Sequence, residues 1–374
     1  MIKIGIITYH FVNNYGACMQ AWALQQYLIR RGFASEIIDY RPSHLEEGGT
    51  FFCPKSFRDI FSLGFLILLK IRHVIGNFSQ SKGLKKAKFE EFHKRYFVLS
   101  SKKFFEGDSL EALSSEYDLF ICGSDQIWNS SRQYGIDENY FLNFVKEDFK
   151  KVSYAASFGK KTLDNRYSSR IRSLLKNFKA ISIREPSGIK VLREIGISHA
   201  EHVLDPTLLI GGDYENAIEP SFTKPYAFSY VLRSKNMANK VNLSVSKLFN
   251  LEIISSENLK GHTDVLSPWE WVGHFKKAKY IITNSYHGTL FSIIFKKPFI
   301  FVALSGKKVE YNERAVSLLS CVGLENNIVT DCDPAKIEEI LENTNFKNAY
   351  YKLSQMRYNS EKFVDDVIKS ILEK

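Results

Sequence analysis

The stretch IKIGIITYHFVNNYGACMQAWALQQYLIRRGFASEIIDY, residues 2–40, decides the fold class. An apolar run at 2–9 predicts a buried strand, and a polar loop at 10–17 follows it. Apolar residues then recur at helical spacing until Gly32 ends the helix, and residues 35–40 predict a second strand. A strand, a helix and a strand in this order form a βαβ unit, which predicts a parallel sheet.

The same alternation returns further along the chain. Apolar strands are predicted at 117–122, 151–157, 180–183 and 202–205, and, after a turn-rich stretch at 211–224, at 225–232, 251–256, 280–285 and 299–304. We therefore predict two α/β domains with parallel, doubly wound sheets that face each other across a cleft. The N-terminal domain is predicted at 1–212, with a largely helical excursion at about 42–115, and the C-terminal domain at 213–345; a helix at 346–374 is expected to pack back on the domains.

Composition indicates a globular protein without special compositional features. A chain of 374 residues is too long for one ordinary core, which favours two domains. Its contents of 44% hydrophobic and 25% charged residues are ordinary for a globular protein. The five cysteines are odd in number and form no CxxC pair, which favours a reducing cytoplasm over a disulfide framework or a zinc site. His199 and His202 are three residues apart and could bind a metal, but a surface turn is the commoner explanation, and we expect no metal requirement.

Charge and hydropathy leave a membrane surface open as a partner. The net charge is +10, and a basic run at 82–103 predicts either a solvated helix face or a contact with an anionic lipid or substrate. Nucleic acid is not expected, because the run has no interleaved stacking aromatics. Residues 60–69, IFSLGFLILL, are too short to span a bilayer; they predict a core or interdomain helix, or a basic-flanked helix resting on the membrane surface.

Polar clusters follow five of the predicted strands. They are VNNYGA (12–17), GSDQIWN (123–129), SFG (157–159), REPSG (184–188) and NSYHG (284–288). Ligands of open α/β sheets bind at the carboxyl ends of the strands, so we expect these clusters to face one crevice. The first loop lacks the GxGxxG spacing of a dinucleotide site, and we expect no NAD or FAD.

The segments GSDQIWN, SYAASFG, SIREPSG, VLDPTLL and TNSYHGTLFSIIFKKPFI, in this order, resemble the polysaccharide pyruvyl transferase family from residue 1 to about 325. The resemblance implies an α/β fold of two Rossmann-like domains that face each other across a cleft, as in the GT-B class. It also implies transfer of a pyruvyl group from phosphoenolpyruvate to sugar hydroxyls as a ketal, in capsular, exopolysaccharide or cell-envelope glycan biosynthesis. It implies phosphoenolpyruvate as co-substrate, no cofactor, and a sugar acceptor, for which we expect a lipid-linked oligosaccharide at the inner face of the membrane.

His287 is the candidate acid-base residue, because it lies where a strand gives way to a helix. The helix dipole would lower its pKa, and a bound trianion would raise the pKa again. The alternative is a histidine that merely caps a helix beside a turn glycine.

Four further residues are expected to bind the donor. The resemblance makes Arg184 a phosphoenolpyruvate-binding arginine, although an ion pair with Glu185 is the alternative. Arg314 is a second cation, and Ser285 and Gly288 lie at the start of the same helix as His287. Some branches of the family carry an arginine at the position of Ser285, so one anion contact must come from elsewhere in this chain.

Six residues are expected to line the cleft and face the acceptor: Asn14, Tyr15, Gly16, Ser124, Asp125 and Gln126. Asp125 could instead orient a base or cap a turn. Asp205, which precedes Pro206, is expected to fix the crossing between the domains rather than to take part in chemistry. Two other functions stay open: a GT-B-type glycosyltransferase that uses a nucleotide sugar, and a non-catalytic glycan-binding relative.

Overall fold

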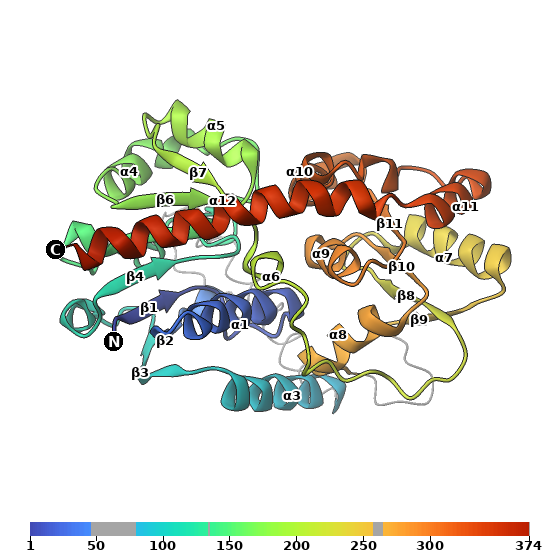
Figure 1. The fold of residues 1–374 in the computed structure, drawn as a ribbon, viewed down its shortest axis with the longest axis horizontal. Coiled ribbons are helices and arrows are strands. Elements are labelled where there is room, and N and C mark those ends of the chain that lie inside the picture. Colours follow the sequence, from blue (N-terminus) through green and yellow to red (C-terminus); the bar gives the residue numbers. More distant parts are fainter. Residues whose placement is uncertain (46–79, 134, 257–264, 374) are drawn as a thin grey trace, which may run out of the picture.

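Two parallel sheets, each covered by helices, make up the protein (Figure 1). The computed structural model describes residues 1–45, 80–133, 135–256 and 265–373. The helix expected at 60–69 lies outside these residues. Within the described ranges, no helix has the length and apolarity that crossing a membrane requires.

The first sheet has seven parallel strands in the order β3-β2-β1-β4-β5-β6-β7. Its central strands are short apolar runs buried on both faces, as parallel strands under two helix layers must be. The strands are β1 (Lys3–Ile7), β2 (Ala34–Arg41), β3 (Leu99–Phe105), β4 (Leu119–Cys122), β5 (Lys151–Ala156), β6 (Ala180–Ile183) and β7 (Ala200–His202). The helices of this half are α1 (Tyr15–Arg30), α3 (Gln80–Tyr96), α4 (Asn165–Leu175), α5 (Pro186–Glu194) and α6 (Pro206–Leu209).

The second sheet has five parallel strands in the order β12-β11-β10-β8-β9. They are β8 (Tyr226–Tyr230), β9 (Glu252–Ser255), β10 (Tyr280–Thr283), β11 (Phe299–Val302) and β12 (Ile328–Val329). The helices are α7 (Lys235–Phe249), α8 (Pro268–Lys277), α9 (Tyr286–Ile294), α10 (Glu313–Val322), α11 (Pro334–Asn343) and the long closing helix α12 (Phe346–Leu372). The predicted α/β fold of two Rossmann-like halves is therefore confirmed.

The described part of the segment at 42–115, predicted as a largely helical excursion, combines helices with a strand. It contains helix α3, but it also contains β3, which pairs with β2 at the edge of the first sheet. This strand buries only Ser100 and Phe104 and exposes Lys102 and Lys103; exposed lysines are typical of an edge strand. Two inward residues are too short a signal for a strand. The limits of the predicted domains stay a prediction.

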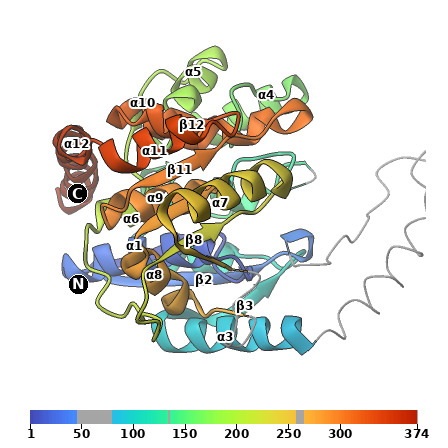
Figure 2. The same ribbon diagram turned by 90° about the vertical axis from the view of Figure 1, so that its right-hand side faces the viewer.

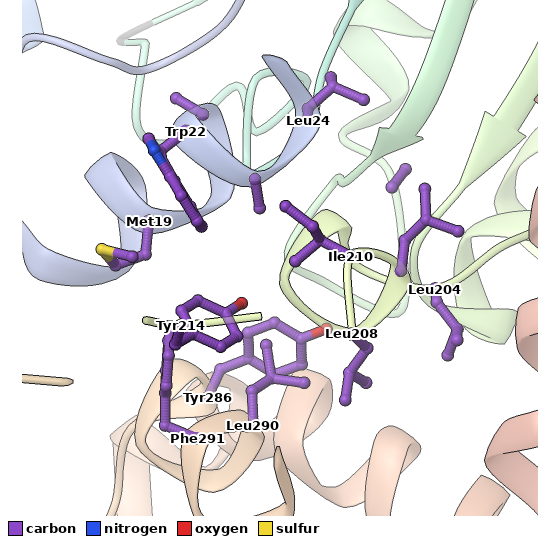
Figure 3. Close-up of a cluster of buried hydrophobic side chains, with 14 of the residues drawn as sticks. Met19, Trp22, Leu24, Leu204, Leu208, Ile210, Tyr214, Tyr286, Leu290 and Phe291 are labelled. Atoms are coloured by element: carbon purple, nitrogen blue, oxygen red, sulfur yellow. The ribbon is translucent and has the colours of Figure 1, made fainter. Parts of the chain in front are cut away.

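Aromatic and aliphatic side chains join the two halves. Figure 3 shows Met19 and Trp22 of α1 facing Tyr214, with Leu290 and Phe291 of α9 beyond it. Tyr15, at the start of α1, stacks on Trp271 of α8 with ring centroids 5.3 Å apart. The halves thus share one continuous hydrophobic core.

Helix α12 runs across both halves (Figures 1 and 2). Tyr350 O–H donates to the carbonyl of Ile293 at the end of α9 (2.8 Å). In the middle of the helix, Arg357 donates to the carbonyl of Leu208 (2.9 Å), and the Ser360 hydroxyl accepts from the N–H of Leu204 (2.9 Å). The helix is therefore fixed to the second half and to the segment that connects the two sheets.

Candidate active site

The chain order reverses at one place in each sheet. In the first sheet β1 lies between β2 and β4, and in the second β8 lies between β9 and β10. Such switch points leave a crevice at the carboxyl ends of the strands, where ligands of α/β sheets bind. A pocket of about 370 Å³ lies there, and residues that follow β1, β4, β8 and β10 all line it. The two switch points therefore form the two walls of one pocket.

His287 lies in this pocket, in the first turn of α9. Its side chain is only 8% exposed, and its Nε2 lies 3.8 Å from Asp205 Oδ2 without a hydrogen-bond partner among the described residues. Burial lowers the pKa of His287 to about 4, although Asp205 and Asp125 raise it. The imidazole is therefore neutral at pH 7, and its proton affinity depends on the charges around it.

The Asp205 carboxylate, buried behind the imidazole, contacts several groups at once. Its Oδ1 accepts from the N–H of Thr207 (3.0 Å) and so caps α6, as expected for a residue at the crossing. Its Oδ2 accepts from Arg184 Nη1 (2.9 Å) and faces His287. Sequence reasoning gave Asp205 the structural role alone, because nothing local to Asp-Pro shows that β6 and β10 bring a cation and an imidazole to it.

Arg184 is buried beside the pocket among three carboxylates. Its Nε donates to Glu185 Oε1 (2.8 Å), and its other nitrogens reach Asp205 and Asp125. Burial opposes its charge, but Glu185 above all holds the pKa of Arg184 above its usual value. The guanidinium does not line the pocket. Its surroundings match the ion-pair alternative, and its contact with a donor stays a prediction.

Arg314 reaches the same group from the pocket side. Its Nη1 lies 3.7 Å from Asp125 Oδ1, and its guanidinium lies over the ring of Tyr286, 5.3 Å from the centroid. Burial lowers the pKa of Arg314 to about 10, and Arg184 adds to this effect. The cation is thus only partly neutralised by Asp125, and it lines the pocket beside His287.

Ser285 and Gly288 start α9. The Ser285 hydroxyl accepts from the N–H of Gly288 (3.3 Å), which makes Ser285 the N-cap of the helix. Ser285 lines the pocket. Gly288 packs against the opposite side, since a Cβ there would lie 2.3 Å from Thr283 Oγ1. The N–H of Gly288 is therefore already bonded to Ser285 and is not free for the predicted contact with a donor. Ser285 itself is placed to face a ligand.

The first loop divides its three predicted residues between different tasks. Asn14 caps α1 and lies exposed at the pocket. Tyr15 turns away from it, donates to the carbonyl of Leu266 (3.0 Å) and joins the halves. Gly16 packs directly on the imidazole, because a Cβ at this position would lie 2.0 Å from His287 Nδ1. Tyr15 is thus a contact between the halves and not a lining residue.

The loop after β4 is divided in a similar way. Asp125 and Gln126 line the pocket. Ser124 is fully buried beneath them, where its N–H donates to Gln20 Oε1 (3.1 Å) and its hydroxyl donates to the carbonyl of Ala155 (3.1 Å). Burial would raise the pKa of Asp125, but Arg184, His287 and Arg314 hold it below its usual value. Asp125 is therefore a permanent anion in the floor of the pocket, and Ser124 supports it from below.

Two pocket arginines were missed from the sequence. Arg132 lies in the loop after β4, and Arg233 lies just after β8. The rule of polar residues at strand ends would have found Arg233, had it been applied to β8. Arg132 is several residues beyond its strand and gives no such signal.

His199 and His202, for which a metal site was the less expected alternative, have different surroundings in the structure. His202 Nε2 lies 3.1 Å from the carbonyl of Arg184, and His199 is exposed. Across the part of the chain that the structure describes, no three His, Cys, Asp or Glu side chains are grouped to hold a metal ion.

Comparison with solved structures places this arrangement in the GT-B class. A crystal structure from Listeria monocytogenes, assigned as a UDP-N-acetylglucosamine 2-epimerase, superposes with a TM-score of 0.54 at 10% identity, covering 100% of this chain and 97% of that chain. A second UDP-N-acetylglucosamine 2-epimerase gives a TM-score of 0.50 at 10% identity, with the same coverage. At this identity the likeness shows the fold alone, and it confirms the predicted GT-B-like architecture.

The family follows from the sequence match. The model of the polysaccharide pyruvyl transferase family matches residues 14–306, so the chain belongs to this family, as predicted. No curated protein matches the chain. Membership supports pyruvyl transfer in polysaccharide biosynthesis as the reaction class.

Proposed function

We propose that this protein transfers the pyruvyl group of phosphoenolpyruvate to two hydroxyls of a sugar, forming a ketal. The observation that carries the proposal is the pocket between the switch points, where a buried neutral imidazole lies beside a partly neutralised arginine, Arg314. Such a site suits a small phosphorylated acid, because guanidinium groups bind phosphate and carboxylate in forked geometry.

The chemistry asks for one residue that moves a proton. In the first step the methylene carbon of phosphoenolpyruvate gains a proton, and a sugar hydroxyl oxygen bonds to the adjacent carbon. The bond from that carbon to the phosphate oxygen then breaks, phosphate leaves with the electron pair, and a second hydroxyl oxygen bonds to the same carbon. The two hydroxyls lose two protons, of which one replaces the proton given to the methylene and the other leaves with phosphate.

His287 is the residue that we assign to this proton. In the free protein burial keeps it neutral. A trianion bound at Arg314 would raise the pKa of the imidazole, so the acid would form only once phosphoenolpyruvate has bound. Ser285 would contact the same anion, and Arg184 would hold Asp205 and Asp125 in place behind it.

The opposite wall is where we propose that the acceptor binds. Asn14, Asp125 and Gln126 offer amide and carboxylate groups that suit sugar hydroxyls. We propose a lipid-linked oligosaccharide of capsular, exopolysaccharide or cell-envelope synthesis as acceptor. The protein would then act in the cytoplasm, in peripheral contact with the inner face of the membrane through its basic segment at 82–103.

The test is incubation with phosphoenolpyruvate and a panel of lipid-linked sugars, with mass spectrometry to detect a pyruvyl adduct and a phosphate assay. Adduct formation with equal phosphate release is expected, and it would exclude a non-catalytic glycan-binding protein. Thermal stabilisation by a UDP-sugar but not by phosphoenolpyruvate would overturn the proposal in favour of a glycosyltransferase.

A further inference from the structure

Ser285 lines the pocket beside His287 and carries no charge, and the nearby cation Arg314 is already partly neutralised by Asp125. A further cation for a multiply charged ligand must therefore come from another element. Asn284, the residue before Ser285, holds the backbone of Arg233 close to Ser285 by hydrogen bonds. The Asn284 amide oxygen accepts from the N–H of Leu232 (2.8 Å), and its amide nitrogen donates to the carbonyl of Arg233. These two bonds continue the pairing of β8 with β10 beyond the last residues of both strands. The Arg233 backbone is therefore fixed beside the start of α9.

The Arg233 side chain lies in the pocket without a carboxylate. Its guanidinium lies over the ring of Tyr311, 4.3 Å from the centroid, and is half-buried. Among the described residues it has no ion pair, and neither has Arg132, which lines the same pocket from the loop after β4. Burial first and Arg132 second lower the pKa of Arg233. Two like charges held at one pocket are stabilised by an anion that both contact.

The two anionic groups of phosphoenolpyruvate can be told apart by charge. The phosphate carries about two negative charges near neutral pH and the carboxylate carries one. Arg314 is already partly neutralised by Asp125, whereas Arg132 and Arg233 are not neutralised by any described carboxylate. Arg132 is also exposed, so a group bound there has a route to solvent when it leaves.

We propose that Arg233, positioned by Asn284 and assisted by Arg132, binds the phosphate of the donor, while Arg314 binds its carboxylate. This assignment rests on the proposed function. Arg233 contacts the substrate, and Asn284 is a positioning residue that acts through it.

The experiment compares three probes: phosphoenolpyruvate, inorganic phosphate and pyruvate, which has the carboxylate alone. Binding is measured by calorimetry on the full chain and by inhibition of phosphate release. Arg233→Gln is expected to weaken phosphoenolpyruvate binding about 10- to 100-fold, in the range of a lost charge-assisted hydrogen bond. It should abolish competitive inhibition by inorganic phosphate and leave inhibition by pyruvate unchanged. Arg233→Lys, which keeps the charge and loses the fork, should fall between the two.

Lys308→Gln is the matched control. Lys308 is an exposed cation near the pocket that donates to Ser234 Oγ (3.1 Å) but does not line the pocket, so its loss tests general positive charge. We expect its affinities to stay within about 2-fold of wild type, as for a screened surface charge.

The role of Asn284 is tested by a double-mutant cycle. Asn284→Ala should raise the KM for phosphoenolpyruvate and leave the KM for the acceptor unchanged. If it acts through Arg233, the double variant Arg233→Gln/Asn284→Ala should bind the donor no more weakly than Arg233→Gln alone. Additive losses would overturn the positioning role.

The outcomes separate the two proposals. If wild type binds phosphoenolpyruvate and a folded Arg233→Gln variant binds it equally well, the phosphate assignment is overturned and the proposed function stands. If wild type binds neither phosphoenolpyruvate nor phosphate and forms no adduct, both are overturned. Equal loss of phosphate and pyruvate inhibition in Arg233→Gln would overturn the division between the two anionic groups.

Discussion

The two walls of the pocket are built in opposite ways. On the N-terminal wall the buried charge is compensated: Asp125 has Arg184 and Arg314 within 3.7 Å, and Ser124 beneath it donates two hydrogen bonds. On the C-terminal wall the imidazole Nε2 of His287 has no hydrogen-bond partner among the described residues. The guanidinium of Arg233 has no ion pair among them. Uncompensated buried groups cost stability and are kept where they act on a ligand. The contrast indicates that the reactive groups come from the second half and the fixed support from the first.

The largest expected difference between the walls is in catalysis. His287→Asn should lower kcat by about 10²- to 10⁴-fold, the range for removal of a general acid-base group. Gln126→Ala, on the other wall, should mainly raise the KM for the acceptor. His199→Asn changes an exposed histidine away from the pocket and serves as control. Phosphate release under saturating donor is the measurement, and near-normal kcat for His287→Asn would remove the assigned role.

The support behind the walls is tested by Asp205→Asn. Asparagine keeps the oxygen that caps α6 and removes the charge that faces Arg184 and His287. Breaking a buried pair should cost about 3–5 kcal/mol of unfolding free energy, measured in urea. Asp213→Asn breaks the exposed pair with Arg30 and should cost less than about 1 kcal/mol. Similar losses for both would show that Asp205 is not a buried anchor.

The contact between the walls is tested by Gly16→Ala. The new methyl carbon would lie 2.0 Å from His287 Nδ1, so the imidazole must move. A displacement of about 1 Å at a reacting group costs roughly 10²-fold in rate. Gly212→Ala, where nothing lies within 4 Å, is the control and should leave kcat unchanged. A Gly16→Ala variant with full activity would show that the position of the ring does not matter.

The smallest expected effect is on the pH dependence of stability. The folded pKa of His287 is about 4, below its ordinary value of 6.5, so the unfolded chain binds the proton first as pH falls. The stability is then complete above about pH 6.5 and is lost toward pH 4, by roughly 2 kcal/mol at pH 5. His287→Asn should lack this loss. His93 and His202, whose pKa values burial also lowers, contribute equally to both proteins and cancel in the comparison.

Much of the architecture was predictable, because short apolar strands alternate with helices and each pattern is local. The strands before Gly123, Arg184 and Asn284 were all placed correctly. Strand β3 was not, because it sits at an edge and buries only two side chains.

The site was less predictable, because the local sequence does not determine the order of the strands in a sheet. Arg184 and His287 both follow strands. The first switch point lies between β1 and β4, and β6, which precedes Arg184, is two strands beyond β4; β10, which precedes His287, borders the second switch point next to β8. Arg184 therefore ends behind the pocket. In the loop after β4, Asp125 and Gln126 line the pocket while Ser124 is buried beneath them, and no local pattern in the sequence separates these neighbours. Gly123, at the start of this loop, leaves room for the carbonyl of Tyr154, which would lie 2.1 Å from a Cβ at this position.

Helix α12 has a mechanical consequence for the two halves. Its N-terminal part is tied to the end of α9, its C-terminal part carries Phe363 against Tyr154 of β5, and its midpoint is tied at Arg357 and Ser360 to the segment around α6. Rotation of one sheet relative to the other would therefore have to bend α12 near its midpoint or break contacts at one of its ends.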